Sequence, residues 1–110
     1  MKKQKALQFK WDEDKAARNE AKYGVSFGEA STIFNDKHAI YRNDLEHSQK
    51  EMREIVIGRA PATKRHLTCF FTRVEGGIIQ IIGARLATHR ERQDYKDNSD
   101  DKTRIVYQIK

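Results

Sequence analysis

The residues best suited to chemistry lie close together in the middle of the sequence. His47, Ser48, Glu51 and Arg53 fall within seven residues of a polar stretch that leads into a predicted strand. A histidine can accept and return a proton near neutral pH, and His47 and Glu51 face the same way if one helical turn separates them. We expect His47 or Glu51 to act as a base. The structural alternative is that His47 caps a loop and Glu51 pairs with Arg53.

Arginines supply the second part of such chemistry, because a guanidinium group can hold a phosphate through two parallel hydrogen bonds. Arg85 ends a predicted strand shortly before a helix start at Thr88, and a helix N-terminus favours an anion. Arg53, Arg59 and Arg73 are further candidates for phosphate contact. The alternative for each of these arginines is an exposed cation with no such role.

Proton transfer beside clustered arginines is the chemistry that metal-free cleavage of a phosphodiester bond needs, and RNA is one substrate of that kind. The 2′-hydroxyl must lose a proton, the charge on the phosphorane oxygens must be stabilised, and the 5′-oxygen must be helped to leave. A histidine or carboxylate can move the protons, and clustered arginines can stabilise the phosphorane.

Three helices are predicted to position these residues. Asp12 is a suitable N-cap for the first, and Gly24 suits the left-handed residue after its end. Ser26 and Glu29 have the spacing of a capping box at the start of the second helix, and Thr88 begins the same pattern for the third. The predicted helices cover residues 12–23, 26–34 and 88–95.

Runs of alternating or continuous apolar residues predict strands at 7–11, 38–41, 53–59, 65–73 and 78–84. A hairpin with Gly76 and Gly77 at its centre pairs Arg73 with Gln80 and places Arg73 and Arg85 on opposite faces. Because two helices precede a series of strands, we expect an α+β fold. Its antiparallel sheet would have the helices on one face and the apolar run 78–84 as a central strand.

The C-terminal residues differ in composition from the rest. Residues 97–101 are all polar, and the alternation at Ile105, Tyr107 and Ile109 is typical of a strand. We therefore predict one domain over residues 1–96 and a tail over 97–110, which could add an edge strand or bind a partner.

The composition excludes several classes of protein. The chain has 110 residues, of which 35% are charged and 37% hydrophobic. This length fits one domain and is too short for a doubly wound dinucleotide fold or an eight-fold barrel. One cysteine cannot form an internal disulfide, and the four histidines are too scattered for a zinc site. With no apolar run of membrane-spanning length, we expect a cytoplasmic protein without metal or cofactor.

The distribution of charge indicates the partner. The net charge is +6, and residues 53–92 alone carry eight basic and three acidic residues. Seven of those eight basic residues are arginines. This favours a polyanionic partner, either a nucleic acid or an acidic protein, over the alternative of a basic surface without a partner.

Several short motifs occur in order along the chain. They include Phe9-Lys10-Trp11-Asp12, Lys22-Tyr23-Gly24-Val25-Ser26-Phe27, His47-Ser48, Ile81-Ile82-Gly83-Ala84-Arg85 and Glu91-Arg92. In this order, over residues 7–95, the sequence resembles the BrnT-type toxin family. The resemblance implies a RelE-like α+β fold and a ribonuclease toxin that inhibits translation. It also implies a ribbon-helix-helix antitoxin, whose complex with the toxin represses their operon, so that operator DNA is bound only through that complex.

The resemblance adds residues at the ends of the domain. Lys15 and Trp11 match family positions at the first strand-to-helix junction, and Trp11 could stack on a base or pack in the core. Tyr95 could approach a phosphate or pack. With Arg59, these three are our candidate RNA-binding residues.

The sequence departs from the family pattern at Tyr23, Val74, Gln80 and Gly83. Val74 and Gln80 stand where the family has arginines. Two alternatives to a nuclease therefore stay open: a catalytically weak member of the same family, or a basic module that binds nucleic acid or a partner without cleaving RNA.

Overall fold

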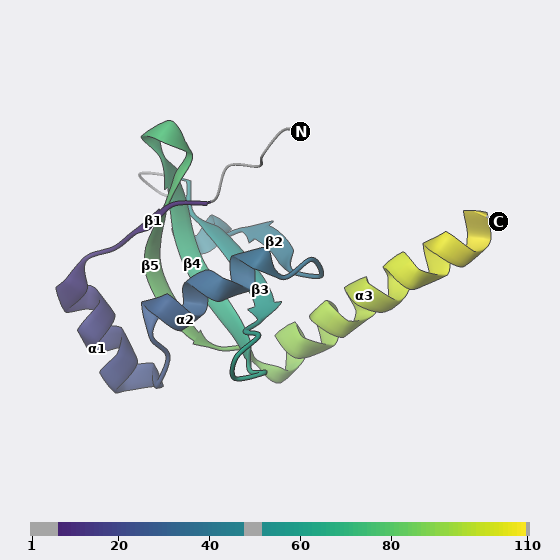
Figure 1. Cartoon of the computed structure of the whole chain (residues 1–110), viewed down its shortest axis with the longest axis horizontal. Helices are drawn as coiled ribbons and strands as arrows, with labels where there is room; N and C mark the ends of the chain where they lie inside the picture. The colour runs from purple at the N-terminus through teal and green to yellow at the C-terminus, as the bar shows by residue number, and fades with distance from the viewer. Residues whose placement is uncertain (1–6, 48–51, 110) are drawn as a thin grey trace.

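The computed structural model describes residues 7–47 and 52–109 (Figure 1). The helices are α1 (Glu13–Tyr23), α2 (Phe27–Thr32) and α3 (His89–Ile109), and the short 3-10 turns are η1 (Ile33–Asn35), η2 (Leu45–His47) and η3 (Glu75–Gly77). The strands are β1 (Phe9–Lys10), β2 (Ile40–Asn43), β3 (Glu54–Arg59), β4 (His66–Val74) and β5 (Ile78–Leu86). This order of elements confirms the predicted α+β class. Within the described residues, no helix has the length and apolar character needed to cross a membrane.

The strands form one mixed sheet in the order β1-β5-β4-β3-β2. β1 runs parallel to β5, whereas the other neighbours are antiparallel. The predicted 78–84 strand is therefore an interior strand of the sheet, as expected, and β4 occupies the middle position. β5 lies between β4 and the two-residue β1, and α1 packs along the remaining length of β5. This leaves β2 as the opposite edge of the sheet.

The predicted helix caps are confirmed in detail. The carboxylate of Asp12 accepts a hydrogen bond from the Lys15 N–H at 3.0 Å, and Gly24 has the left-handed φ of 71°. Ser26 Oγ accepts from the Glu29 N–H at 3.0 Å. The Glu29 carboxylate, however, is bound by Arg65 and by Thr63 Oγ1, so this box serves partly to tie α2 to the β3–β4 turn.

The core lies between the sheet and the α2–η1 segment. Phe27, Ile33 and Phe34 of that segment are buried against Val56 and Phe71. Gly58 permits this close approach, since a Cβ there would stand 3.0 Å from the Ile33 Cβ. The expectation that all helices share one face is wrong. The start of α3 packs on the opposite face, because Tyr95 and Glu91 contact His66 and Thr68, which alternate with the core residues of β4.

The predicted hairpin register is wrong by one residue. The turn uses three residues, Glu75–Gly77, with Gly76 and Gly77 both at positive φ, so that Val74 pairs with Ile78 and Arg73 with Ile79. A bulge between Phe70 and Phe71 shifts the register back by one residue. Beyond it, farther from the turn, Phe70 pairs with Gly83, as the predicted register requires. Arg73 and Arg85 nevertheless point to opposite faces, as expected. Arg73 lies over the Phe71 ring, and Arg85 lies over the ring of Phe70.

The C-terminal segment is a helix rather than an edge strand. α3 continues through Ile109 and extends away from the sheet (Figure 1). The helix begins at the predicted capping box, in which the Glu91 N–H donates to Thr88 Oγ1 at 3.1 Å. Residues 89–109 include no glycine or proline to end it, and helix extension is easier than helix nucleation. Local continuity therefore outweighs the two-residue alternation.

Candidate functional site

The turn after β2 fixes the candidate base. The Asp44 N–H donates to the Arg53 carbonyl at 2.8 Å, and the His47 N–H donates to the Asp44 carbonyl at 3.2 Å. His47 Nδ1 lies 3.0 Å from the Asp44 carboxylate, which is 6% exposed, while the imidazole side chain is 58% exposed. An Nδ1–H that donates to this carboxylate leaves Nε2 directed away from it as the proton acceptor.

His47 opens onto a cavity of about 280 Å³, here called the histidine cavity. Two of its walls come from α1 and from the end of β5, and the others come from the β2–β3 segment and β4. It is lined by Asn19, Tyr23, Asp44, His47, Arg53, Phe70, Ile82, Gly83, Ala84 and Arg85. Three residues that the sequence predicted as catalytic therefore meet in one cavity: His47 and Arg53 from the β2–β3 segment, and Arg85 from β5.

Asn19 holds the α1 wall against the end of β5. Its Nδ2 donates to the carbonyls of Val25 and Ala84, at 3.0 and 2.8 Å, and its Oδ1 accepts from the Ala84 N–H at 3.2 Å. The two bonds to Ala84 use the edge of β5 that β1 leaves unpaired, and the bond to Val25 closes the turn after α1. They also fix Tyr23, one helical turn further along α1, at the margin of the cavity.

Arg85 is held in place from α3. Its Nη1 and Nη2 donate to the two oxygens of Glu91 at 2.8 and 3.0 Å, and Nη1 also donates to the Leu86 carbonyl. Burial raises the pKa of Glu91, but hydrogen bonds from Arg85, from the Thr88 N–H and from Thr68 outweigh it and hold that pKa at about 2. These contacts use three of the five guanidinium N–H donors, so two remain for a bound anion.

The arrangement combines an oriented proton acceptor with two guanidinium groups. His47 is exposed enough to reach a ligand, and Asp44 sets its orientation. Arg53 and Arg85 can donate to an anion held in the cavity, although Glu91 already balances the charge of Arg85. The Phe70 ring, with Arg85 5.3 Å from its centroid, provides an apolar wall. In the described residues, no group of three or more His, Cys, Asp or Glu is placed to hold a metal ion.

The structure places the other predicted residues elsewhere. Arg73 lies on the opposite face and donates to Glu54 at 2.7 Å. Trp11 packs edge-to-face on Phe27 and borders the core. Lys15 is exposed in the first turn of α1 and does not line the cavity. Glu51 lies outside the described residues.

Arg59 and Tyr95 lie together on the face of the sheet that carries the histidine cavity, at the end near His66. The Tyr95 hydroxyl donates to Asp36 Oδ2 at 2.7 Å, and the Arg59 N–H donates to that same oxygen at 2.8 Å. A second cavity, of about 340 Å³, is lined by these residues. The sequence thus identified two groups of residues but could not show that they are spatially separate.

Four residues of the site were missed by the sequence analysis: Asn19, Asp44, Phe70 and Glu91. Asp44 could have been found, because a carboxylate three residues before a histidine in a polar turn is well placed to bind its ring. Glu91 was predicted only as a helix cap. Its bond to Arg85, and that of Asn19 to residue 84, depend on tertiary contacts that carry no local signal.

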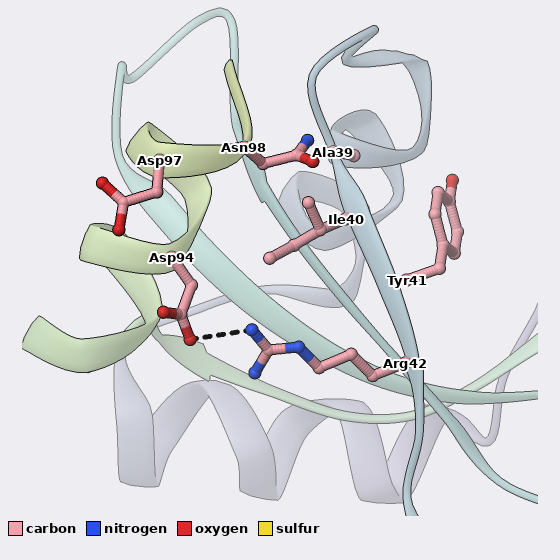
Figure 2. Close-up of a pocket in the computed structure, with 7 residues that line it drawn as sticks. All are labelled: Ala39, Ile40, Tyr41, Arg42, Asp94, Asp97 and Asn98. Carbon is pink, nitrogen blue, oxygen red and sulfur yellow. Dashed lines mark hydrogen bonds and ion pairs between the residues drawn. The ribbon is translucent and has the colours of Figure 1, made fainter. Parts of the chain in front are cut away.

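A groove between β2 and α3 has a different charge. Figure 2 shows Arg42 of β2 directed toward Asp94 of α3, at an Nη2–Oδ2 distance of 2.7 Å. Asp97 also lines this space of about 520 Å³. Two carboxylates against one guanidinium make the groove unsuitable for a polyanion. The histidine cavity is therefore the better candidate for an anionic substrate.

Fold and cavity define a class: a small α+β protein with an oriented histidine and two arginines where an anionic substrate can enter. The model of the family described as "Ribonuclease toxin, BrnT, of type II toxin-antitoxin system" matches residues 11–91. The chain belongs to this BrnT family, which confirms the resemblance found in the sequence. An antitoxin partner is therefore implied.

A solved structure agrees with the fold. The ribonuclease toxin BrnT of Brucella abortus superposes with a TM-score of 0.58 at 22% sequence identity, covering 76% of this chain and 100% of that one. At this identity the likeness confirms the fold alone. No curated protein matches the sequence.

Proposed function

We propose that this protein is a metal-independent endoribonuclease that cleaves mRNA in the cytoplasm and so inhibits translation. The observation that supports it most directly is the Asp44–His47 pair at the mouth of a cavity shared with Arg53 and Arg85. Family membership supports the class of activity. The chemistry of the cavity residues supports the mechanism.

In this mechanism His47 Nε2 takes the proton from the 2′-hydroxyl of a bound ribose. The 2′-oxygen then attacks the adjacent phosphorus, and the bond from phosphorus to the 5′-oxygen breaks. The leaving 5′-oxygen takes a proton from water and becomes a 5′-hydroxyl, the other product is a 2′,3′-cyclic phosphate, and protonated His47 gives its proton back to the solvent. Arg53 and the two remaining donors of Arg85 stabilise the negative charge that develops on the phosphorane oxygens.

The departures from the family pattern bear on the alternative that this protein is a catalytically weak member of the family. Val74 and Gln80, which replace family arginines, lie toward the hairpin end of the sheet and do not line the histidine cavity. Tyr23 and Gly83 do line it. Missing arginines that lie outside the cavity favour a nuclease over a catalytically weak member. The changes inside the cavity bear on which RNA sequences fit.

The test is cleavage of a defined mRNA by purified protein, with the cut sites mapped by primer extension. Cleavage by the wild type is expected, and His47→Ala should lose roughly 10²–10⁴-fold in rate, the usual contribution of a general base. Glu75→Ala, at an exposed position of the hairpin turn away from both cavities, is the control. A wild type that binds its antitoxin but leaves RNA intact would instead support the non-cleaving alternative.

We also propose that the antitoxin is a ribbon-helix-helix protein, and that operator DNA is bound through the complex alone. Expression of the toxin by itself should arrest growth. Co-expression with a ribbon-helix-helix protein encoded beside it should restore growth and give a complex that co-purifies. If the toxin without its partner binds the operator as tightly as the complex does, this part of the proposal is wrong.

A further inference from the structure

A second basic region surrounds Tyr95, at the end of the sheet opposite the hairpin. Tyr95 lines two neighbouring cavities, of about 340 and 380 Å³. Arg59 and Lys64 line the first, and Arg92 and Lys96 line the second. These five residues, here called the Tyr95 surface, come from β3, from the β3–β4 turn and from α3.

The cations of the Tyr95 surface differ from several other arginines of the protein in their partners. Arg42, Arg65, Arg73 and Arg85 each form an ion pair with a carboxylate. Among the side chains that the structure describes, those of residues 7–47 and 52–99, no carboxylate forms an ion pair with the four cations of the Tyr95 surface, and Arg92 Nη1 donates to the Ala87 carbonyl at 2.8 Å. Their positive charge is therefore available to an external anion.

The one carboxylate that lines these two cavities is already occupied. Asp36 accepts hydrogen bonds from the Tyr95 hydroxyl at 2.7 Å and from the N–H groups of Arg59 and His38 at 2.8 and 2.9 Å. Burial lowers the pKa of His66, and the charges of Arg59 and Arg92 lower it further. Two cations from different elements thus act on one point of the surface.

The Tyr95 surface and the histidine cavity share one face of the sheet. Phe70 lines the cavity, and His66, four residues earlier on the same face of β4, contacts the Tyr95 ring at 4.9 Å between centroids. Arg53 and Arg59 mark the two sites at opposite ends of β3. At a rise of about 3.3 Å per residue they are roughly 20 Å apart, more than one nucleotide can span.

We infer that the Tyr95 surface is a second binding site, for the phosphates of single-stranded RNA several nucleotides from the cleaved bond. This inference rests on the proposed function, since it takes RNA as the substrate. It predicts that long RNA is bound more tightly than a fragment filling the histidine cavity. Removing the second site should then weaken binding of long RNA while the chemical step is unchanged.

The experiment measures binding in a His47→Ala background, so that RNA stays intact. Arg59→Gln/Lys64→Gln is compared with Lys10→Gln/Arg18→Gln, which removes two exposed cations near the N-terminus. For an unstructured RNA several times longer than a trinucleotide, the salt dependence log Kobs against log[salt] should become shallower by about 1.4 in the first variant. Trinucleotide affinity, and both affinities in the control, should not change.

Two outcomes would overturn the inference: equal salt slopes in the two double variants, or a first variant that loses antitoxin binding but not RNA binding. The second outcome would identify a protein-docking surface instead. Failure of the proposed nuclease function looks different. In that case the wild-type protein, with His47 intact, cleaves no RNA, whether or not the salt slopes of the His47→Ala variants differ.

Discussion

Two acidic residues, one on each side of β2, hold aromatic side chains for different purposes. Asp44, just after the strand, binds the His47 ring, whereas Asp36, just before it, binds the Tyr95 hydroxyl. Asp44 is buried, and Asp36 is partly exposed. The held groups differ, because the imidazole bound to Asp44 through Nδ1 offers Nε2 as a proton acceptor, while burial and the bond to Asp36 raise the pKa of Tyr95 to about 12.

In the proposed function, this difference separates a site for chemistry from a site for binding. With its pKa raised to about 12, the Tyr95 hydroxyl keeps its proton at neutral pH and donates it to Asp36. This hydrogen bond fixes the position of α3 relative to the β2 end of the sheet. Asp44 orients the imidazole of His47, which can accept and release a proton, beside the guanidinium groups of Arg53 and Arg85. The same carboxylate contact therefore serves a reactive group in one place and a structural one in the other.

The largest effect should come from Asp44→Asn. An asparagine amide can donate to Nδ1 and so stabilise the tautomer whose Nε2 carries the proton, which cannot serve as a base. We expect kcat for a short RNA to fall by about 10–100-fold with little change in KM. Asp36→Asn is the matched control and should leave kcat for that RNA unchanged. Equal losses of kcat in both variants would mean that Asp44 stabilises the folded structure and does not orient His47.

The sequence predicted well those features that depend on neighbouring residues. The caps at Asp12, Ser26 and Thr88 and the left-handed Gly24 follow from side chains within three residues of the helix ends. His47, Arg53 and Arg85 were named because their chemistry suits phosphate transfer. That they share a cavity depends on the sheet order, which no local pattern specifies.

The errors have physical causes of their own. The hairpin register depended on two glycines that both adopt positive φ in a three-residue turn, and the bulge at Phe70/Phe71 compensated for the shift. Opposite faces for Arg73 and Arg85 were therefore predicted correctly from a wrong register. The alternation of Ile105, Tyr107 and Ile109 did not produce a strand, because the helix that begins after Thr88 continues through these residues. Asp36 and Tyr95 are 59 residues apart, so their contact left no trace in the sequence.

Glu91 connects the two regions, since α3 presents it to Arg85 of the cavity and carries Tyr95 one turn later. Its pKa in the folded protein is about 2, below the ordinary glutamate value of 4.5, so Glu91 stabilises the fold above pH 4.5 and loses this contribution as pH falls toward 2. At 1.36 kcal/mol per pKa unit, the contribution at neutral pH is about 3 kcal/mol.

Glu91→Gln should therefore lower the free energy of unfolding by about 3 kcal/mol at pH 7. The gap to the wild type should narrow between pH 5 and pH 2 in urea unfolding experiments followed by circular dichroism. Glu75→Gln, at an exposed position of the hairpin turn, is the control and should show no such gap. A gap that persists at pH 2 would assign the loss to packing rather than charge.

The smallest effect is expected at the other end of β2. Tyr95→Phe removes one hydrogen bond to Asp36 and keeps the ring that contacts His66. The Asp36 carboxylate still accepts hydrogen bonds from the backbone N–H groups of Arg59 and His38, so its negative charge stays stabilised. We expect a loss of about 1 kcal/mol in the free energy of unfolding, the usual net value of one hydrogen bond.

Tyr41→Phe provides the reference for this measurement, because Tyr41 is 46% exposed and packs on Phe34 and Phe71 through its ring. Its loss of stability should be smaller than that of Tyr95→Phe in the same urea unfolding experiment. If the two variants are equally stable, the Tyr95 hydroxyl does not anchor α3. Asp36 would then stabilise the β2 end through backbone N–H groups alone, and the likeness between the two carboxylates would be limited to their position beside the strand.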